Sequence, residues 1–178
     1  DLGVINAKGE QIAYAGPFNL AQANYSHAEW FLKAMQRQYY ISDVFLGLRG
    51  LPHFIVAVRN TYQGNPWILR ATIDFVAFNT LVKNIHIGKT GFAFIVNRQG
   101  EMQTTAFTKA SVDILPNKSI YAEFIDKSIA STNDIRIIHK PDIFRDKNIY
   151  VATFLNKGQW LLVYQQRKLE ASMSLWLT

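Results

Sequence analysis

Residues 66–103 constrain the fold of this chain more than any other stretch of its sequence. Their pattern predicts, in order, a strand over 67–75, a helix over 76–86, a turn over 88–91, a strand over 92–97 and a further strand after the turn at Gln99 and Gly100. Strands joined by short turns pair antiparallel, because parallel pairs need longer crossover connections. The stretch therefore predicts an α+β fold with mainly antiparallel sheets.

The chain before this stretch has its own start and stop signals. Ser26 is a candidate N-cap for a helix, with Glu29 three residues later as its capping-box partner. Glycines and prolines separate the strands, and apolar residues recur at helical spacing inside the helix. The elements expected here are a hairpin over residues 2–14, a helix ending near 37, a strand over 39–46 and a return strand over 54–58.

A second, smaller unit is expected after the first. Residues 104–118 contain Pro116 and few periodic apolar residues, so they are interpreted as a linker. The elements expected beyond it are a helix over 120–129, strands over 135–139, 149–155 and 160–165, and the start of a helix over 168–177. The sequence thus predicts two units, residues 1–106 and 107–178, each a sheet flanked by helices.

Composition excludes several classes of protein. The chain has no cysteine, which rules out disulfides, thiolate metal sites and a cysteine nucleophile. Its formal net charge is +6, but no run of Lys and Arg exceeds two residues, so we expect no nucleic-acid partner. No apolar run approaches the roughly 20 residues of a membrane span. The first strand begins almost at residue 1, and we expect the chain to be part of something longer.

Motifs for catalysis, cofactors and metals are not found. Gly88-Lys89-Thr90 imitates the end of a P-loop, but the glycine required five residues earlier is replaced by Lys83. A plain helix-to-strand turn is the better interpretation. The four histidines are far apart in sequence and lack a metal-binding spacing. We therefore expect no cofactor and no metal.

One group of residues has the composition of a small-molecule site, namely apolar and aromatic side chains with a few polar ones nearby. The interpretation as plain hydrophobic core stays open for Phe31, and Asp74 can alternatively cap the following helix. The candidate ligand-binding residues are Trp30, Phe31, Tyr40, Ser42, Asp43, Arg49, His53, Arg70 and Asp74.

The order of elements resembles that of the double Cache (PAS-like) extracytoplasmic sensor domains of bacterial receptors. Trp30, Asp74 and the run over residues 91–97 followed by Gly100 support the resemblance. It implies two PAS-like modules, of which residues 1–106 are the membrane-distal, ligand-binding one and residues 107–178 the proximal one. The long N-terminal helix typical of the family is missing from this sequence. The resemblance also implies a homodimeric receptor in the inner membrane, with this domain in the periplasm or outside the cell.

Members of this family that bind amino acids carry an Arg-x-Trp-Tyr motif, in which the Arg holds the ligand carboxylate, and a later Asp for the ammonium group. Trp30 and Asp74 match this pattern, whereas Ala28 replaces the Arg and Phe31 the Tyr. We therefore expect ordinary amino acids to bind poorly, with Arg49 or Arg70 as possible substitutes for the missing charge.

The function that the resemblance implies is ligand sensing for a two-component sensor histidine kinase, with no enzymatic activity in this domain. A Cache sensor of a chemoreceptor or a diguanylate cyclase is the alternative. A small hydrolase that uses Asp43, His53 and Asp74 is an alternative of another class.

Overall fold

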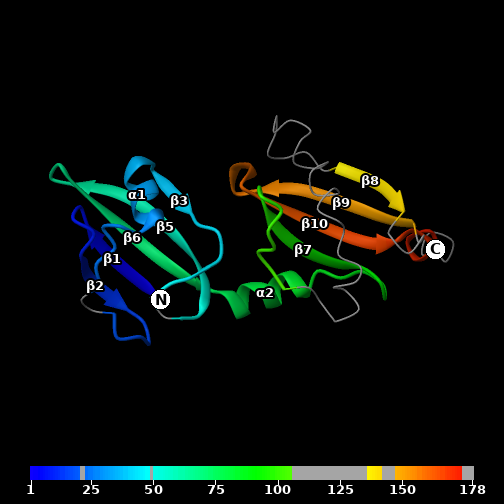
Figure 1. Cartoon of the computed structure of the whole chain (residues 1–178), viewed down its shortest axis with the longest axis horizontal. Helices are drawn as coiled ribbons and strands as arrows, with labels where there is room; N and C mark the ends of the chain where they lie inside the picture. Colours follow the sequence, from blue (N-terminus) through cyan, green and yellow to red (C-terminus); the bar gives the residue numbers. More distant parts are fainter. Residues whose placement is uncertain (21–22, 49, 106–135, 142–146, 174–178) are drawn as a thin grey trace. The chain divides into compact units, whose positions relative to one another are not determined.

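The chain divides into two compact units, Asp1–Phe78 and Asn79–Thr178, each built on an antiparallel sheet (Figure 1). This computed structural model describes residues 1–20, 23–48, 50–105, 136–141 and 147–173. Every strand pairing within them is antiparallel, so the predicted α+β class is confirmed.

The sheet of the first unit has the order β2-β1-β6-β5-β3, with β4 also paired to β5. Its strands are β1 (Leu2–Asn6), β2 (Gln11–Ala15), β3 (Tyr39–Ile41), β4 (Phe45–Leu46), β5 (Pro52–Tyr62) and β6 (Asn65–Asp74). The first strand of the chain lies between β2 and β6, where Gly3 is opposite Arg70. The sheet thus joins residues nearly seventy positions apart, which places the N-terminal hairpin beside the centre of the unit.

Helix α1 (Glu29–Gln36) covers one face of this sheet and buries Trp30, Phe31 and Ala34 against it. The prediction that Ser26 caps this helix is wrong. The N-cap is Ala28, which makes no side-chain cap hydrogen bond, and the Ala28 N–H donates to the Tyr25 carbonyl in a turn that precedes the helix. The helix therefore begins after that turn.

The strand expected over residues 39–46 is broken into β3 and β4. At the break, the Ser42 hydroxyl accepts a hydrogen bond from the Ile55 N–H (2.9 Å), in the position that a ladder carbonyl would take. A side chain that satisfies a backbone donor in this way ends regular pairing. The chain after Ser42 can then bend away from β5.

The second unit has the sheet order β7-β10-β9-β8. Its elements are β7 (Phe92–Asn97), β8 (Arg136–Pro141), β9 (Lys147–Leu155), the short helix η1 (Asn156–Gly158), β10 (Trp160–Arg167) and α5 (Lys168–Met173). Helix α2 (Phe75–Lys83) follows β6 directly. The strand expected after Gly100 is reduced to a single bridge between Val96 and Met102.

The division into compact units falls at another place than the predicted boundary near residue 106. The chain divides between Phe78 and Asn79, inside α2, because β7 pairs with β10 and so belongs to the second sheet. Sequence order suggested that β7 belongs to the first unit, because β7 follows β6 and α2 closely. The helix expected over 120–129 and most of the linker lie outside the described residues.

Candidate functional site: a cavity between helix and sheet in the first unit

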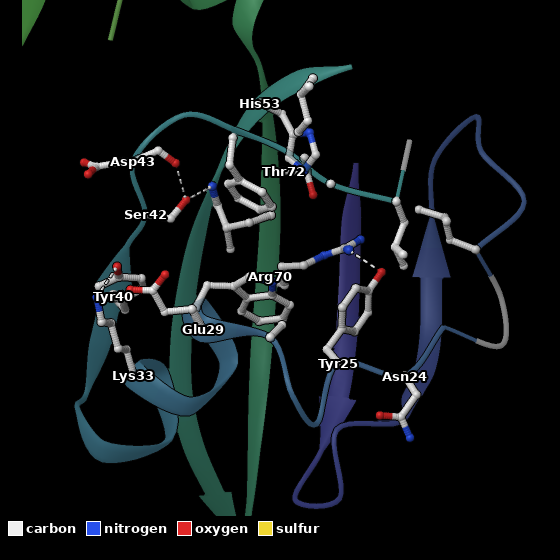
Figure 2. A pocket seen from close by; sticks show the side chains of 18 residues that line it. Asn24, Tyr25, Glu29, Lys33, Tyr40, Ser42, Asp43, His53, Arg70 and Thr72 are labelled. Atoms are coloured by element: carbon white, nitrogen blue, oxygen red, sulfur yellow. Dashed lines mark hydrogen bonds and ion pairs between the residues drawn. The ribbon is translucent and has the colours of Figure 1, made fainter. Parts of the chain in front are cut away.

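A cavity of about 480 Å³ lies in the first unit beside α1, within the size range of small-molecule sites. Its wall combines apolar side chains with a few polar ones, as Figure 2 shows. The lining residues are Leu20, Asn24, Tyr25, Ala28, Glu29, Trp30, Lys33, Tyr40, Ser42, Asp43, Phe45, Leu46, Gly47, Leu48, His53, Ile55, Arg70 and Thr72.

Six of the nine predicted ligand residues line this cavity, namely Trp30, Tyr40, Ser42, Asp43, His53 and Arg70. Phe31 is 4% exposed and belongs to the hydrophobic core cluster under α1. Arg49 lies outside the described residues. Asp74 is not in the wall, because its carboxylate caps α2: Oδ1 accepts the Val76 N–H at 2.8 Å and the Ala77 N–H at 3.3 Å.

Arg70 is the buried cation of this site. It is 3% exposed, and its Nη2 lies 2.9 Å from a carboxylate oxygen of Asp1, whose side chain is fully buried. Nη1 donates to the Tyr25 hydroxyl at 2.7 Å. Gly3, opposite Arg70, leaves room for the guanidinium, since a Cβ there would lie 3.2 Å from Nη2. Arg70 is therefore neither a solvated surface residue nor an unpaired charge.

Tyr25 also lines the cavity, although it was not among the residues expected to bind a ligand. The β1–β2 turn fixes its position, because its backbone N–H donates to the Gly9 carbonyl at 2.7 Å. Gly9 has φ +83°, and a Cβ there would lie 2.6 Å from the Ser26 Cα. A glycine at the turn thus permits the close approach that sets Tyr25 beside Arg70, and this turn glycine was the one available signal.

His53 is 4% exposed and held in a single orientation. Its Nδ1 is 2.7 Å from the Leu51 carbonyl oxygen, and because a carbonyl can only accept, Nδ1 carries a hydrogen. The ring packs on Phe45 with centroids 4.7 Å apart, and Gly47 lies against Nε2 without a Cβ. This tautomer presents Nε2 as an acceptor if the ring is neutral.

The rim of the cavity carries an ion pair between Lys33 and Glu29 on α1 (2.5 Å). Their side chains are 40% and 77% exposed, so solvent screening leaves this pair a small contribution to stability. The hydrogen bond with Glu29, followed by that with Tyr40, raises the pKa of Lys33. Lys33 therefore stays charged at the entrance to the cavity.

The hydrolase alternative is not supported by this geometry. Asp43 and His53 line the cavity, but the carboxylate of Asp74 is engaged as a helix cap. Within the described part of the chain, no group of three or more His, Cys, Asp or Glu residues is placed to hold a metal ion. The same residues contain no helix long and apolar enough to cross a bilayer.

Comparison by sequence finds no match, either to a protein-family model or to a curated protein. Solved structures do match. The extracellular domain of the histidine kinase rpHK1S-Z16 has a TM-score of 0.63 and 16% identity, over 97% of this chain and 72% of that chain. The ligand-binding domain of the Pseudomonas aeruginosa PAO1 amino acid chemoreceptor PctB, in complex with L-arginine, has a TM-score of 0.63 and 14% identity, over 98% and 68%.

A third match is the extracellular domain of the histidine kinase mmHK1S-Z3, with a TM-score of 0.62 and 13% identity over 92% of this chain. The chain spans 60% of the length of that domain. Identities this low show a shared fold, and they confirm the predicted resemblance to Cache sensor domains at that level.

Proposed function

We propose that this chain is the extracytoplasmic small-molecule sensor domain of a transmembrane sensor histidine kinase, with the cavity of the first unit as its ligand site. The observation that carries the proposal is a cavity of about 480 Å³ whose wall combines a buried, ion-paired arginine and a buried histidine with aromatic, aliphatic and other polar side chains. Such a combination is typical of ligand pockets, whereas a core without function rarely retains buried charges.

In this proposal the first unit is the membrane-distal module and the second the proximal one. A ligand would act by its different affinity for two arrangements of the receptor, since equal affinity for both shifts nothing. The full-length receptor is proposed to be a homodimer in the inner membrane. A stable dimer must bury more than about 1,000 Å². We expect two copies of the isolated chain to bury less than this, and therefore to associate weakly.

We further propose that free α-amino acids are not the preferred ligands. Ala28 lines the cavity at the position where amino-acid-binding members of the family carry an Arg, and it offers no charge. Arg70 does not replace that Arg as an available cation, since Asp1 already neutralises it. Micromolar binding of a common α-amino acid in calorimetry would contradict this part of the proposal.

A chemoreceptor is the second candidate for the whole protein. It is favoured by the match to the ligand-binding domain of PctB, whose TM-score of 0.63 equals that of the match to rpHK1S-Z16. The sequence that follows this domain in the full-length protein separates the two, because a kinase module and a chemoreceptor signalling helix differ unmistakably.

A thermal-shift screen against small metabolites tests the sensor proposal. A ligand at a hundred times its dissociation constant stabilises the folded chain by about 2.7 kcal/mol. We expect Trp30→Ala to remove that stabilisation and the control Tyr62→Ala, on an exposed side chain that is not among the lining residues of this cavity, to preserve it. Stabilisation that survives in Trp30→Ala would place the ligand elsewhere.

A further inference from the structure

We propose that the Tyr25 hydroxyl donates a hydrogen bond to the ligand, and that it thereby selects compounds with a carbonyl or carboxylate oxygen. Arg70 is a positioning residue: it orients the Tyr25 hydroxyl and affects the ligand through that hydroxyl. The inference rests on the proposed function, because it names the chemistry of the ligand for the same cavity. Figure 2 shows the two side chains meeting at the cavity wall, with the Arg70 guanidinium directed at the Tyr25 oxygen.

The direction of the phenolic hydrogen follows from the chemistry of the pair. A guanidinium has donors and no acceptor, so the Tyr25 oxygen must accept from Arg70 Nη1 across their 2.7 Å contact. The hydrogen of Tyr25 therefore points away from Arg70. Among the described residues no acceptor for it is found, although Tyr25 is only 7% exposed and lines the cavity. A ligand oxygen in the cavity would supply that acceptor.

Tyr25 is also held in place before any ligand arrives. Its backbone is fixed to Gly9, its ring packs on Trp30 with centroids 5.1 Å apart, and the Arg70 guanidinium carbon lies 5.1 Å from its ring centroid. A donor fixed from three sides loses little further conformational freedom on binding, which favours affinity and selectivity.

The electrostatics of the cluster explain the selectivity. A hydrogen bond from a guanidinium polarises the hydroxyl, which makes Tyr25 a stronger donor than an isolated phenol. Asp1 neutralises Arg70, so the cluster offers a polarised donor without a net charge. Amide and carboxylate oxygens both satisfy such a donor. An ammonium group does not, because it is itself a donor and a cation.

Two other polar groups of the cavity wall are less suited to this role. The Ser42 hydroxyl donates to the Asp43 carbonyl and accepts from the Ile55 N–H. The hydrogen on His53 Nδ1 is engaged by the Leu51 carbonyl. Unlike these two groups, the Tyr25 hydroxyl is fixed and buried with a hydrogen that faces no acceptor among the described residues.

The test uses three probes with one apolar body and different polar ends: 3-methylbutanoate, 3-methylbutanamide and 3-methylbutylammonium. Calorimetry and thermal shift are measured on the whole chain at millimolar probe. We expect the carboxylate and the amide to bind and the ammonium compound to bind at least tenfold more weakly. This discrimination is read on the unaltered protein, so it does not depend on the folding of any variant.

Variants then assign the discrimination to Tyr25. Tyr25→Phe should weaken the amide and carboxylate probes about tenfold and leave the ammonium probe unchanged, since one hydrogen bond of ~1.4 kcal/mol corresponds to that factor. Tyr14→Phe is the matched control: its hydroxyl accepts from the Phe18 N–H outside the cavity wall. Arg70→Lys, which keeps a cationic donor, should retain a preference for the amide over the ammonium probe.

Full affinity of Tyr25→Phe for the amide probe would overturn the inference, and so would a wild-type protein that prefers the ammonium probe. In both cases the cavity would still bind a small molecule, and the proposed function would stand. Failure of all three probes would overturn the inference as well, while the metabolite screen with Trp30→Ala decides the proposed function separately.

Discussion

Among the residues with described burial, only the first unit buries charged side chains. In the first unit, the face under α1 buries an arginine paired with Asp1, together with Ser42, His53 and Thr72. The second unit also buries polar side chains, including Asn97, Asn148 and Gln165, but no charged one among the residues with described burial. Its main cluster is apolar, and its members are Phe94, Val96, Tyr150, Ala152, Phe154, Leu161 and Val163. Buried charges cost desolvation that packing does not return. Among residues with described burial, such charges occur in the first unit alone. The first unit is therefore where we expect a ligand to bind.

Two carboxylates show the same contrast. Asp1 is buried against the guanidinium of Arg70 in the first unit. In the second, exposed Glu170 on α5 accepts hydrogen bonds from the Lys89 and Thr90 N–H groups and from the Thr90 hydroxyl. The turn that imitates a P-loop thus does hold an anionic group, and that group belongs to the chain itself.

The largest expected effect comes from breaking the buried ion pair. Asp1→Ala leaves the Arg70 guanidinium buried without its counter-charge, which should lower the free energy of unfolding by about 3–5 kcal/mol in urea denaturation. The control Glu29→Ala breaks the exposed pair with Lys33 and should cost about 0.3–0.5 kcal/mol. A loss below about 1 kcal/mol for Asp1→Ala would rank the buried pair with surface pairs.

Glycine substitutions compare the packing of the two units. At Gly91 a Cβ would overlap the Ile87 carbonyl oxygen, which is backbone, and the Tyr164 hydroxyl, so Gly91→Ala should cost about 1–3 kcal/mol in urea denaturation. At Gly3 the neighbours are side-chain ends, with Gln11 Oε1 at 2.7 Å, which can shift. Gly3→Ala is therefore expected to lose less stability, and the reverse order would contradict the packing described for the second unit.

A smaller effect is expected at the junction between β6 and α2. Asp74→Ala removes the acceptor for the Val76 and Ala77 N–H groups and should cost about 0.5–2 kcal/mol in the free energy of unfolding. Because Asp74 is outside the cavity wall, affinity for the amide probe should be unchanged. Asp74→Asn, which retains a cap acceptor, is the matched variant. A tenfold loss of probe affinity in Asp74→Ala would restore the ligand role expected from sequence.

The smallest effect concerns the pH dependence of the second unit. Backbone hydrogen bonds from Lys89, then the Thr90 side chain, lower the pKa of Glu170 from 4.5 to about 2. A carboxyl whose pKa is depressed on folding stabilises the fold above its unfolded pKa, and this contribution is lost as the pH falls through the folded value. The stability difference between wild type and Glu170→Gln should therefore shrink as the pH falls from 5 to 2. Melting curves whose separation is constant over this range would show that Glu170 is not held by the turn.

Local pattern was enough to predict most strands, the existence of both main helices and the α+β class. Alternation and turn glycines are short-range signals, and β7 (Phe92–Asn97) was predicted to the residue for that reason. Its partner could not be predicted in this way, because β10 lies more than sixty residues further along the chain. The difference between the predicted boundary and the division into compact units follows from this long-range pairing.

The candidate site, too, could be predicted from the sequence only in part. Residue type indicated that Trp30, Tyr40, Ser42, Asp43, His53 and Arg70 belong near a ligand, since polar side chains among aromatic ones are unusual in a core. For Asp74 residue type gave no decision, because a strand-to-helix junction and a ligand contact favour the same residue type, and the structure shows the helix-cap contact.

The sequence by itself thus determined most elements, the fold class and six of the residues that line the candidate cavity, because those depend on residue type and on neighbours within a turn or two of chain. The tertiary structure alone decided which sheet holds β7, that Asp1 neutralises Arg70, and that Tyr25 meets its guanidinium. The two contacts of Arg70, with Tyr25 and with Asp1, join residues 45 and 69 positions apart, and the β7–β10 pairing also joins residues more than sixty positions apart. Side-chain geometry across such separations depends on the register of the whole sheet, and no local pattern encodes it.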